Sequence, residues 1–209
     1  MGEIVVQAFI SLDGVVQGGG GPDEDREGGF QLGGWAMDYD RAHGDAGTDS
    51  GSDSGSPVRE WESRTEALLL GRKTYDIWAR SWGVWPEDAP GLMGELARRY
   101  NRVPKYVVSR TRTELEWKNS FLLGPDVAPE VARLRDEIDG EIRIWGSTEL
   151  VRTLAGAGLI DEYRLCVYPL LLGTGKKLFP EGFPYAELQL TSTRPLASGV
   201  LVNTYRRVD

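Results

Sequence analysis

The chain is poor in the residues that build disulfides, metal sites and histidine-dependent active sites. Its 209 residues include one cysteine, Cys166, and one histidine, His43. A single cysteine excludes a disulfide within the chain, and its apolar surroundings predict a buried, unreactive thiol. A lone histidine makes a zinc site or a serine–histidine–aspartate hydrolase a weak interpretation. We therefore predict a cytoplasmic protein without a resident metal.

Long apolar runs and an excess of positive charge are also missing. No stretch approaches the ~20 apolar residues that span a bilayer, and the N-terminus lacks the basic and apolar regions of a signal peptide. The net charge is -8, whereas a nucleic-acid partner requires a basic face. We expect neither a membrane nor a nucleic-acid partner. A local basic pocket for one phosphorylated small molecule remains compatible with this charge.

Apolar side chains larger than alanine are absent from Gly44 to Ser56, which contains only Gly, Asp, Ser, Ala and Thr. Such a segment buries too little apolar surface to offset its ordering entropy, so it predicts a flexible surface insertion at about 44–56. Three aspartates, Asp45, Asp49 and Asp53, suggest calcium. Their spacing does not match the D-x-[DN]-x-[DN]-G loop, and a solvated acidic linker is the preferred interpretation.

Outside that insertion, the hydrophobic pattern predicts strands that alternate with helices. The chain is 40% hydrophobic, with 7 Trp and 8 Tyr, which suffices for one core, and we expect a single domain over residues 1–209. The pattern predicts an α/β fold with a mostly parallel central sheet of about eight strands, flanked by helices, and an antiparallel C-terminal hairpin. The expected strands are 3–10, 67–70, 105–109, 117–123, 141–145, 162–171, 188–193 and 199–207, and the expected helices are 57–66, 71–78, 92–100, 127–138 and 148–155, with a short helix or ordered lid at 33–37.

Three of the expected strands are followed by turns that suit phosphate. These turns are Gly71-Arg72-Lys73-Thr74, Ser109-Arg110 and Gly146-Ser147-Thr148. The first backbone N–H groups of a helix are free to bind an anion, and ligands of open α/β sheets bind where the strands end. Each turn alone could be a helix cap or a surface charge, and neither G-x-G-x-x-G nor G-x-x-x-x-G-K-[ST] occurs as a fingerprint. Together the three turns predict a dinucleotide site.

The same segments resemble a known family. In chain order they are SLDG, LLLGRKTYD, KYVVSR, the strand-Gly-Ser-helix turn, LIDEYRL and LLGTGKKLF. This series is similar to the dihydrofolate-reductase-like superfamily. It is most similar to stand-alone bacterial proteins that resemble the C-terminal reductase domain of the bifunctional riboflavin-pathway deaminase-reductase. The resemblance covers nearly the whole chain apart from the insertion at about 44–56.

This resemblance implies an NADPH-binding (NADP-binding) reductase that forms homodimers. The GRKT turn and the Ser-Arg pair would hold the adenosine phosphates, the Gly-Ser turn the pyrophosphate, and the segment from Ala8 to Gly14 would border the nicotinamide. The implied cofactor-binding residues are Ala8, Gly14, Gly71, Arg72, Lys73, Thr74, Ser109, Arg110, Gly146, Ser147, Thr148 and Leu150.

The substrate side departs from the riboflavin-pathway pattern. Those enzymes typically have Glu-Gly-Gly where this chain has Trp145-Gly146-Ser147, so an indole replaces a carboxylate. Their zinc deaminase domain is also absent. We therefore expect a planar substrate stacked on Trp145 or Trp35. Asp13 is the candidate proton donor or relay, although Asp13-Gly14 could equally form a simple turn.

These observations predict an NADPH-dependent reductase that transfers a hydride to a small pteridine-like, pyrimidine-like or other planar C=N or C=O substrate. The alternative is a protein of the same fold that binds NADPH or a small ligand without reducing anything. Loss of the substrate-side carboxylate motivates this alternative.

Overall fold

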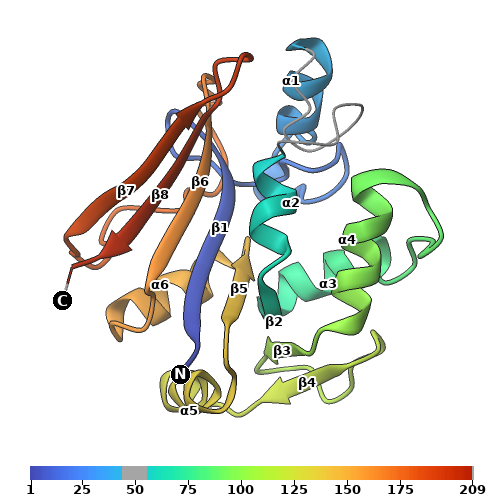
Figure 1. Ribbon diagram of the computed structural model, residues 1–209, viewed down its shortest axis with the longest axis vertical. Coiled ribbons are helices and arrows are strands. Elements are labelled where there is room, and N and C mark those ends of the chain that lie inside the picture. The colour runs from blue at the N-terminus through green and yellow to red at the C-terminus, as the bar shows by residue number, and fades with distance from the viewer. Residues whose placement is uncertain (44–55, 209) are drawn as a thin grey trace.

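The computed structural model describes residues 1–43 and 56–208, and a mixed sheet with helices on both faces organises them (Figure 1). The sheet order is β4-β3-β2-β5-β1-β6-β8-β7. All pairs from β4 to β6 are parallel, whereas β8 is antiparallel to both β6 and β7. The predicted eight-stranded, mostly parallel sheet and its antiparallel C-terminal hairpin are confirmed. The strands are β1 (Glu3–Ser11), β2 (Thr65–Gly71), β3 (Lys105–Val108), β4 (Ser120–Leu123), β5 (Glu141–Trp145), β6 (Glu162–Tyr168), β7 (Leu188–Pro195) and β8 (Leu201–Arg207).

Helices cover both faces of this sheet and divide the core into layers. The helices are α1 (Trp35–His43), α2 (Pro57–Glu62), α3 (Arg72–Ser81), α4 (Gly91–Arg102), α5 (Val127–Glu137) and α6 (Thr148–Gly156), with one 3-10 turn, η1 (Glu27–Gly29). Side chains from α5 and α6 pack with alternate residues of β1 and β5 on one face. Side chains from α2, α3 and α4 pack on the other face. This layering fits an α/β sheet whose strands are buried on both sides.

A buried ionic network crosses β5, β1 and β6 on the face opposite α5 and α6. Arg143 is fully buried and donates to Gln7, to the Trp61 carbonyl and to Glu141. Arg164 donates to both carboxylate oxygens of Glu141, at 2.7 and 2.8 Å. Burial alone would raise the pKa of Glu141, but the guanidinium groups outweigh it and lower that pKa. The buried carboxylate is therefore charged and paired.

The element boundaries differ from expectation at several places. The helix expected at 57–66 ends at Glu62, and β2 begins at Thr65, within the range expected to be helical. The strand expected at 162–171 ends at Tyr168 because Pro169 cannot donate to a ladder. The strand expected at 117–123 begins at Ser120, since Trp117 is anchored by its indole N–H, which donates to Asn101 at 2.7 Å. Residues 33–37 were expected to be the entry to a short helix or an ordered lid, and α1 begins among them, at Trp35, and runs to His43.

The insertion predicted at about 44–56 falls almost wholly on residues 44–55, outside the described part of the chain. In residues 1–43 and 56–208, every helix is too short or too polar to cross a membrane.

Candidate functional site

A cleft of about 1710 Å³ lies where β2, β3, β4 and β5 end. The turns that follow these strands contribute to its lining, as expected for an open α/β sheet. The three predicted phosphate turns, which are far apart in sequence, therefore meet in one cavity. The predicted residues that line it are Ala8, Gly71, Arg72, Lys73, Thr74, Ser109, Arg110, Trp145, Gly146, Ser147, Thr148 and Leu150.

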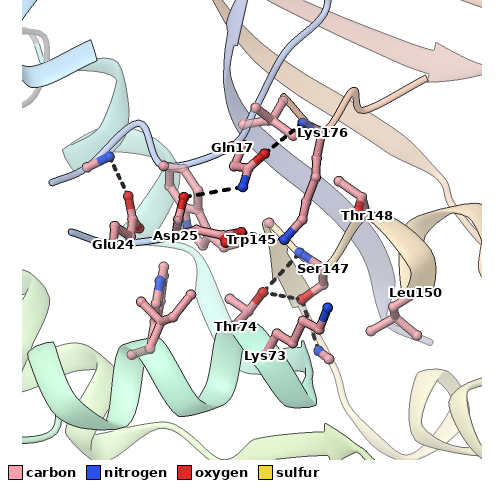
Figure 2. A pocket seen from close by; sticks show the side chains of 18 of the residues that line it. Gln17, Glu24, Asp25, Lys73, Thr74, Trp145, Ser147, Thr148, Leu150 and Lys176 are labelled. Carbon is pink, nitrogen blue, oxygen red and sulfur yellow. Dashed lines mark hydrogen bonds and ion pairs between the residues drawn. The ribbon is translucent and has the colours of Figure 1, made fainter. Parts of the chain in front are cut away.

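Two of these turns are joined by hydroxyl groups (Figure 2). The Ser147 N–H donates to Thr74 Oγ1 at 3.0 Å, and the two hydroxyls are also 3.0 Å apart. The Gly71 N–H donates to Ser147 Oγ at 2.9 Å. Ser147 adopts a left-handed conformation with φ 50°, which non-glycine residues rarely do. Gly146 precedes it at φ 54°, where an added Cβ would lie 3.0 Å from Thr74 Oγ1. Glycine is therefore required for this close approach.

This network leaves donors for an anion. Whichever of the Thr74 and Ser147 hydroxyls donates to the other, one O–H proton stays available. The first turns of α3 and α6 also receive no side-chain cap. Their free N–H groups carry the positive ends of the helix dipoles. Two helix N-termini and one hydroxyl thus suit phosphate oxygens.

Basic side chains surround these turns, but they differ in how they are paired. Arg72 donates to Asp76 at 3.1 Å, and Arg112 donates to the other oxygen of Asp76 at 2.7 Å. Ser109 Oγ accepts from the N–H groups of the two residues that end the following turn, Thr111 and Arg112. Arg110 is exposed and lines the cleft. Its guanidinium is a suitable fork for a phosphate monoester.

An acidic segment lies across the basic side chains. Residues 17–27, the strap, are anchored where Gln17 Oε1 accepts from the Lys176 N–H at 3.0 Å (Figure 2). Lys176 Nζ contacts Asp25 at 2.6 Å and Glu27 at 2.5 Å. Glu27 also pairs with Lys73 in α3. Hydrogen bonds from Lys176 and then Lys73 lower the pKa of Glu27 to about 2. The strap is thereby tied to the start of α3 and to the loop after β6.

Glu24, in the same strap, was not predicted from the sequence and lines the cleft. Its carboxylate accepts from the Gly20 N–H at 2.6 Å (Figure 2). Burial raises its pKa, and hydrogen bonds from Gly20 and Gly21 only partly oppose this. Glu24 is therefore a carboxyl group in the cleft that holds its proton to a higher pH than an exposed glutamate.

Aromatic rings line another part of the cleft. Phe9, Trp78, Trp82, Trp85, Tyr100 and Trp145 all contribute to the lining. Trp145 is the member of this group predicted as a substrate contact. The sequence leaves Trp78 and Trp82 open between cleft and core, and the density of aromatic residues there favours core. Trp85 and Tyr100, from the segment after α3 and from α4, carried no such prediction, and only the packed helices show which rings reach the cleft.

Three predicted residues do not line the cleft: Asp13, Gly14 and Trp35. Asp13 accepts hydrogen bonds from Ser11 Oγ at 2.6 Å, Leu172 N at 3.1 Å and Gly173 N at 2.8 Å. The Ser11 hydroxyl and then the two N–H groups lower the pKa of Asp13 to about 2. An ionised carboxylate committed to three donors is a turn anchor and cannot supply a proton near neutral pH. The turn interpretation of Asp13-Gly14 therefore replaces the proton-donor interpretation.

Trp35 belongs to the core. It is buried, its indole N–H donates to the Gln17 carbonyl at 2.8 Å, and its ring meets Tyr168 edge-on. Stacking of a substrate on Trp35 does not fit this position. Across residues 1–43 and 56–208, no group of His, Cys, Asp and Glu side chains is arranged to hold a metal ion.

Comparison with solved structures places this geometry in a known fold. A putative riboflavin biosynthesis protein from Shewanella sp. PV-4 is similar, with a TM-score of 0.71 at 21% identity, covering 99% of each chain. Dihydrofolate reductase from Enterococcus faecalis, complexed with NADP(H) and RAB-propyl, has a TM-score of 0.57 at 15% identity over 99% of this chain and 97% of that one. A pyrimidine reductase-like protein from Corynebacterium diphtheriae has a TM-score of 0.58 at 12% identity, covering 99% and 92%. The fold is dihydrofolate-reductase-like, as predicted.

Sequence comparison shows the family. The proteins YyaP and YwjB of Bacillus subtilis are 30% and 26% identical over 143 and 141 residues, in each case 68% of this chain and 74% of the relative. The family model described as the RibD C-terminal domain matches residues 3–202. The chain therefore belongs to the RibD C-terminal domain family.

Proposed function

We propose that this protein is an NADPH-dependent reductase that acts on a small planar substrate with a C=N or C=O bond. The observation that carries the proposal is the meeting of Gly71–Thr74, Ser109–Arg110 and Gly146–Thr148 in one cleft. Membership of the RibD C-terminal domain family supports it, as does the likeness in fold to a dihydrofolate reductase complexed with NADP(H).

The donors in the cleft fit a dinucleotide phosphate. The uncapped starts of α3 and α6, with the spare hydroxyl proton of the Thr74–Ser147 pair, would hold the pyrophosphate. Arg110 and Arg72 would contact the phosphate on the adenosine ribose. Bound NADPH would supply a hydride to the carbon of the substrate double bond, while a proton completes the nitrogen or oxygen.

The chain's own part in the chemistry is to orient the two reactants and to supply that proton. Glu24 lines the cleft, and burial raises its pKa. It therefore remains protonated at a higher pH than an exposed glutamate and is the side chain we propose as the proton source, in place of Asp13.

Titration of NADPH and NADH by calorimetry tests the cofactor site. Arg110→Ala should weaken NADPH by ~1.5–3 kcal/mol, the usual value of a hydrogen bond to a charged group, and leave NADH nearly unchanged. Arg72→Ala should have the smaller effect, because Arg72 already shares Asp76 with Arg112. Arg133→Ala is the matched control, since Arg133 pairs only with Glu130 and Glu137 on the exposed side of α5.

Absence of NADPH binding at millimolar concentration would refute the cofactor assignment. Tight NADPH binding with no oxidation of NADPH by any planar C=N or C=O compound would instead identify a binding protein of the same fold.

A further inference from the structure

The aromatic residues of the cleft form a continuous wall, defined here as Phe9, Trp145, Trp78, Tyr100, Trp82 and Trp85. Ring centroids are 5.3 Å apart for Phe9–Trp145 and 6.0 Å for Trp145–Trp78. Tyr100 lies 4.9 Å from Trp78 and 5.1 Å from Trp82, and Trp82 lies 6.0 Å from Trp85. Trp85 ends the wall and is 38% exposed. The aromatic wall therefore extends from β1 and β5 to the surface without a break.

The polar group of Trp145 is turned away from the cleft. The Trp145 indole N–H donates to Glu62 Oε1 at 2.7 Å, and Glu62 is 1% exposed. Thr65 Oγ1 donates to the second oxygen of Glu62 at 2.9 Å. Trp145 is half-buried and therefore offers ring surface to a ligand, because its N–H is used behind the wall. Tyr100 is 1% exposed and supports the wall from within.

Glu62 cannot itself serve as a ligand contact. Both of its oxygens are occupied, and the positive charge of Arg143 faces it within the interior. A carboxylate is the natural partner for the N–H edge of an aminopyrimidine or pterin, since it accepts two parallel hydrogen bonds. Here the carboxylate nearest the wall is hidden behind an indole, so recognition at this position depends on ring contact.

Most basic residues that line the cleft lie on its turns and loops. Arg72, Lys73 and Arg110 come from the turns after β2 and β3, and Lys176 and Lys177 come from the loop after β6. Arg80, in the last turn of α3, is the basic residue nearest in sequence to Trp78 and Trp82. Val58, Met93 and Leu96 supplement the aromatic rings. This distribution favours an apolar ring system over a phosphorylated substrate.

We propose that the aromatic wall is the substrate subsite and that it takes a planar compound of two or three fused rings, recognised by ring contacts without a requirement for a phosphate group. That the bound compound is the substrate rests on the proposed reductase function. That the wall binds such a compound rests only on the wall and on the position of Glu62.

Riboflavin and riboflavin 5′-phosphate are suitable probes because they share a three-ring system and differ by one phosphate. Equilibrium dialysis against protein saturated with NADP+ measures both by flavin absorbance. We expect the two affinities to agree within about threefold. Trp85→Leu should weaken both by about 3- to 10-fold, the usual value of one aromatic contact. Because Trp85 is partly exposed, this variant should fold normally. Trp82→Leu tests the middle of the wall, and Tyr185→Leu, at an exposed aromatic outside the cleft, is the matched control.

Each outcome has a defined meaning. The proposal is wrong if the phosphorylated compound binds more than about tenfold tighter, if Trp85→Leu and Trp82→Leu bind like Tyr185→Leu, or if NADP+ displaces the flavin. Parallel titration of NADPH separates this test from that of the function. NADPH binding without ring binding refutes the wall alone, and ring binding without NADPH binding refutes the reductase function alone.

Discussion

Thr74→Val provides a direct test of the network that joins α3 to α6. In the structure, Thr74 Oγ1 accepts from the Ser147 N–H and contacts the Ser147 hydroxyl, both at 3.0 Å. Valine preserves the shape but removes the acceptor, so two hydrogen bonds are lost and the half-buried Ser147 N–H has no partner. Each lost bond is worth ~0.5–1.5 kcal/mol, which predicts a total loss of about 2 kcal/mol. For a domain of this size, that corresponds to a Tm lower by roughly 4–8 °C.

The same substitution should weaken NADPH by about tenfold, since it also removes the spare hydroxyl proton and loosens the turn at the start of α6. Differential scanning calorimetry and NADPH titration measure the two effects. Thr191→Val is the matched control, because Thr191 Oγ1 donates to the Thr204 carbonyl at 3.2 Å on exposed β7, and it should change stability by no more than ~0.5 kcal/mol. Thr74→Ser should restore both properties. If Thr74→Val melts and binds like Thr191→Val, the network has no role in holding the cofactor turn.

Four further predictions follow from the strap, the turn at Asp13 and β7. Glu27→Gln releases Lys73 and leaves Lys176 paired with Asp25, so NADPH should bind up to about tenfold tighter at low salt and less so at high salt; weaker binding by calorimetry would contradict this. If Glu24 is the proton source, the reductase rate should fall as the pH rises through its raised pKa, and a pH profile of Glu24→Gln should lack that limb. The pKa of Asp13 is about 2, against an ordinary value of 3.8. The ionised carboxylate therefore stabilises the fold fully above pH 3.8, and this stabilisation is lost as the pH falls through 2. Asp13→Asn should lower Tm above that pH range and not below it, with the NADPH affinity unchanged. We propose a homodimer through β7, where every residue after Leu188 is exposed, and sedimentation that shows only monomer at all concentrations would contradict it.

The local pattern of the sequence predicts elements well where their ends carry strong signals. Glu141 to Trp145 is bounded by Gly140 and Gly146, and the strand there matches expectation at both ends. The strand at Glu162 was expected to continue to Leu171, but Pro169 ends it first. The apolar character of the expected strand did not reveal where it ends, because strand pairing depends on backbone N–H groups and proline has none.

The candidate site was predictable where it consists of turns and unpredictable where it depends on partners far away in the chain. Gly71 and Gly146 could be predicted as candidate phosphate turns because Gly71 ends a strand and Gly146 directly follows one. The role of Asp13 depends on Leu172 and Gly173, which lie about 160 residues later in the chain. The Asp13 carboxylate accepts hydrogen bonds from their backbone N–H groups. No local pattern contains that pairing, nor the pairing of Lys176 with Asp25.

The two tryptophans chosen as substrate contacts show the same limit. Trp145 ends a strand and lines the cleft, whereas Trp35 begins a helix and is enclosed by Gln17 and Tyr168. Both are large aromatic residues beside glycine, so composition does not separate them. Their positions relative to the sheet do.

The place of β1 in the sheet has a consequence for how the chain folds. Val5 is paired with Arg143 on one side and with Glu162 on the other, so β1 finds its two neighbours only after some 140 to 160 further residues have been made. Pairing over such sequence distances is slow, because the loop entropy must be lost before the contacts form. Until then an apolar strand with two open edges is exposed, and such a strand is prone to aggregation during synthesis.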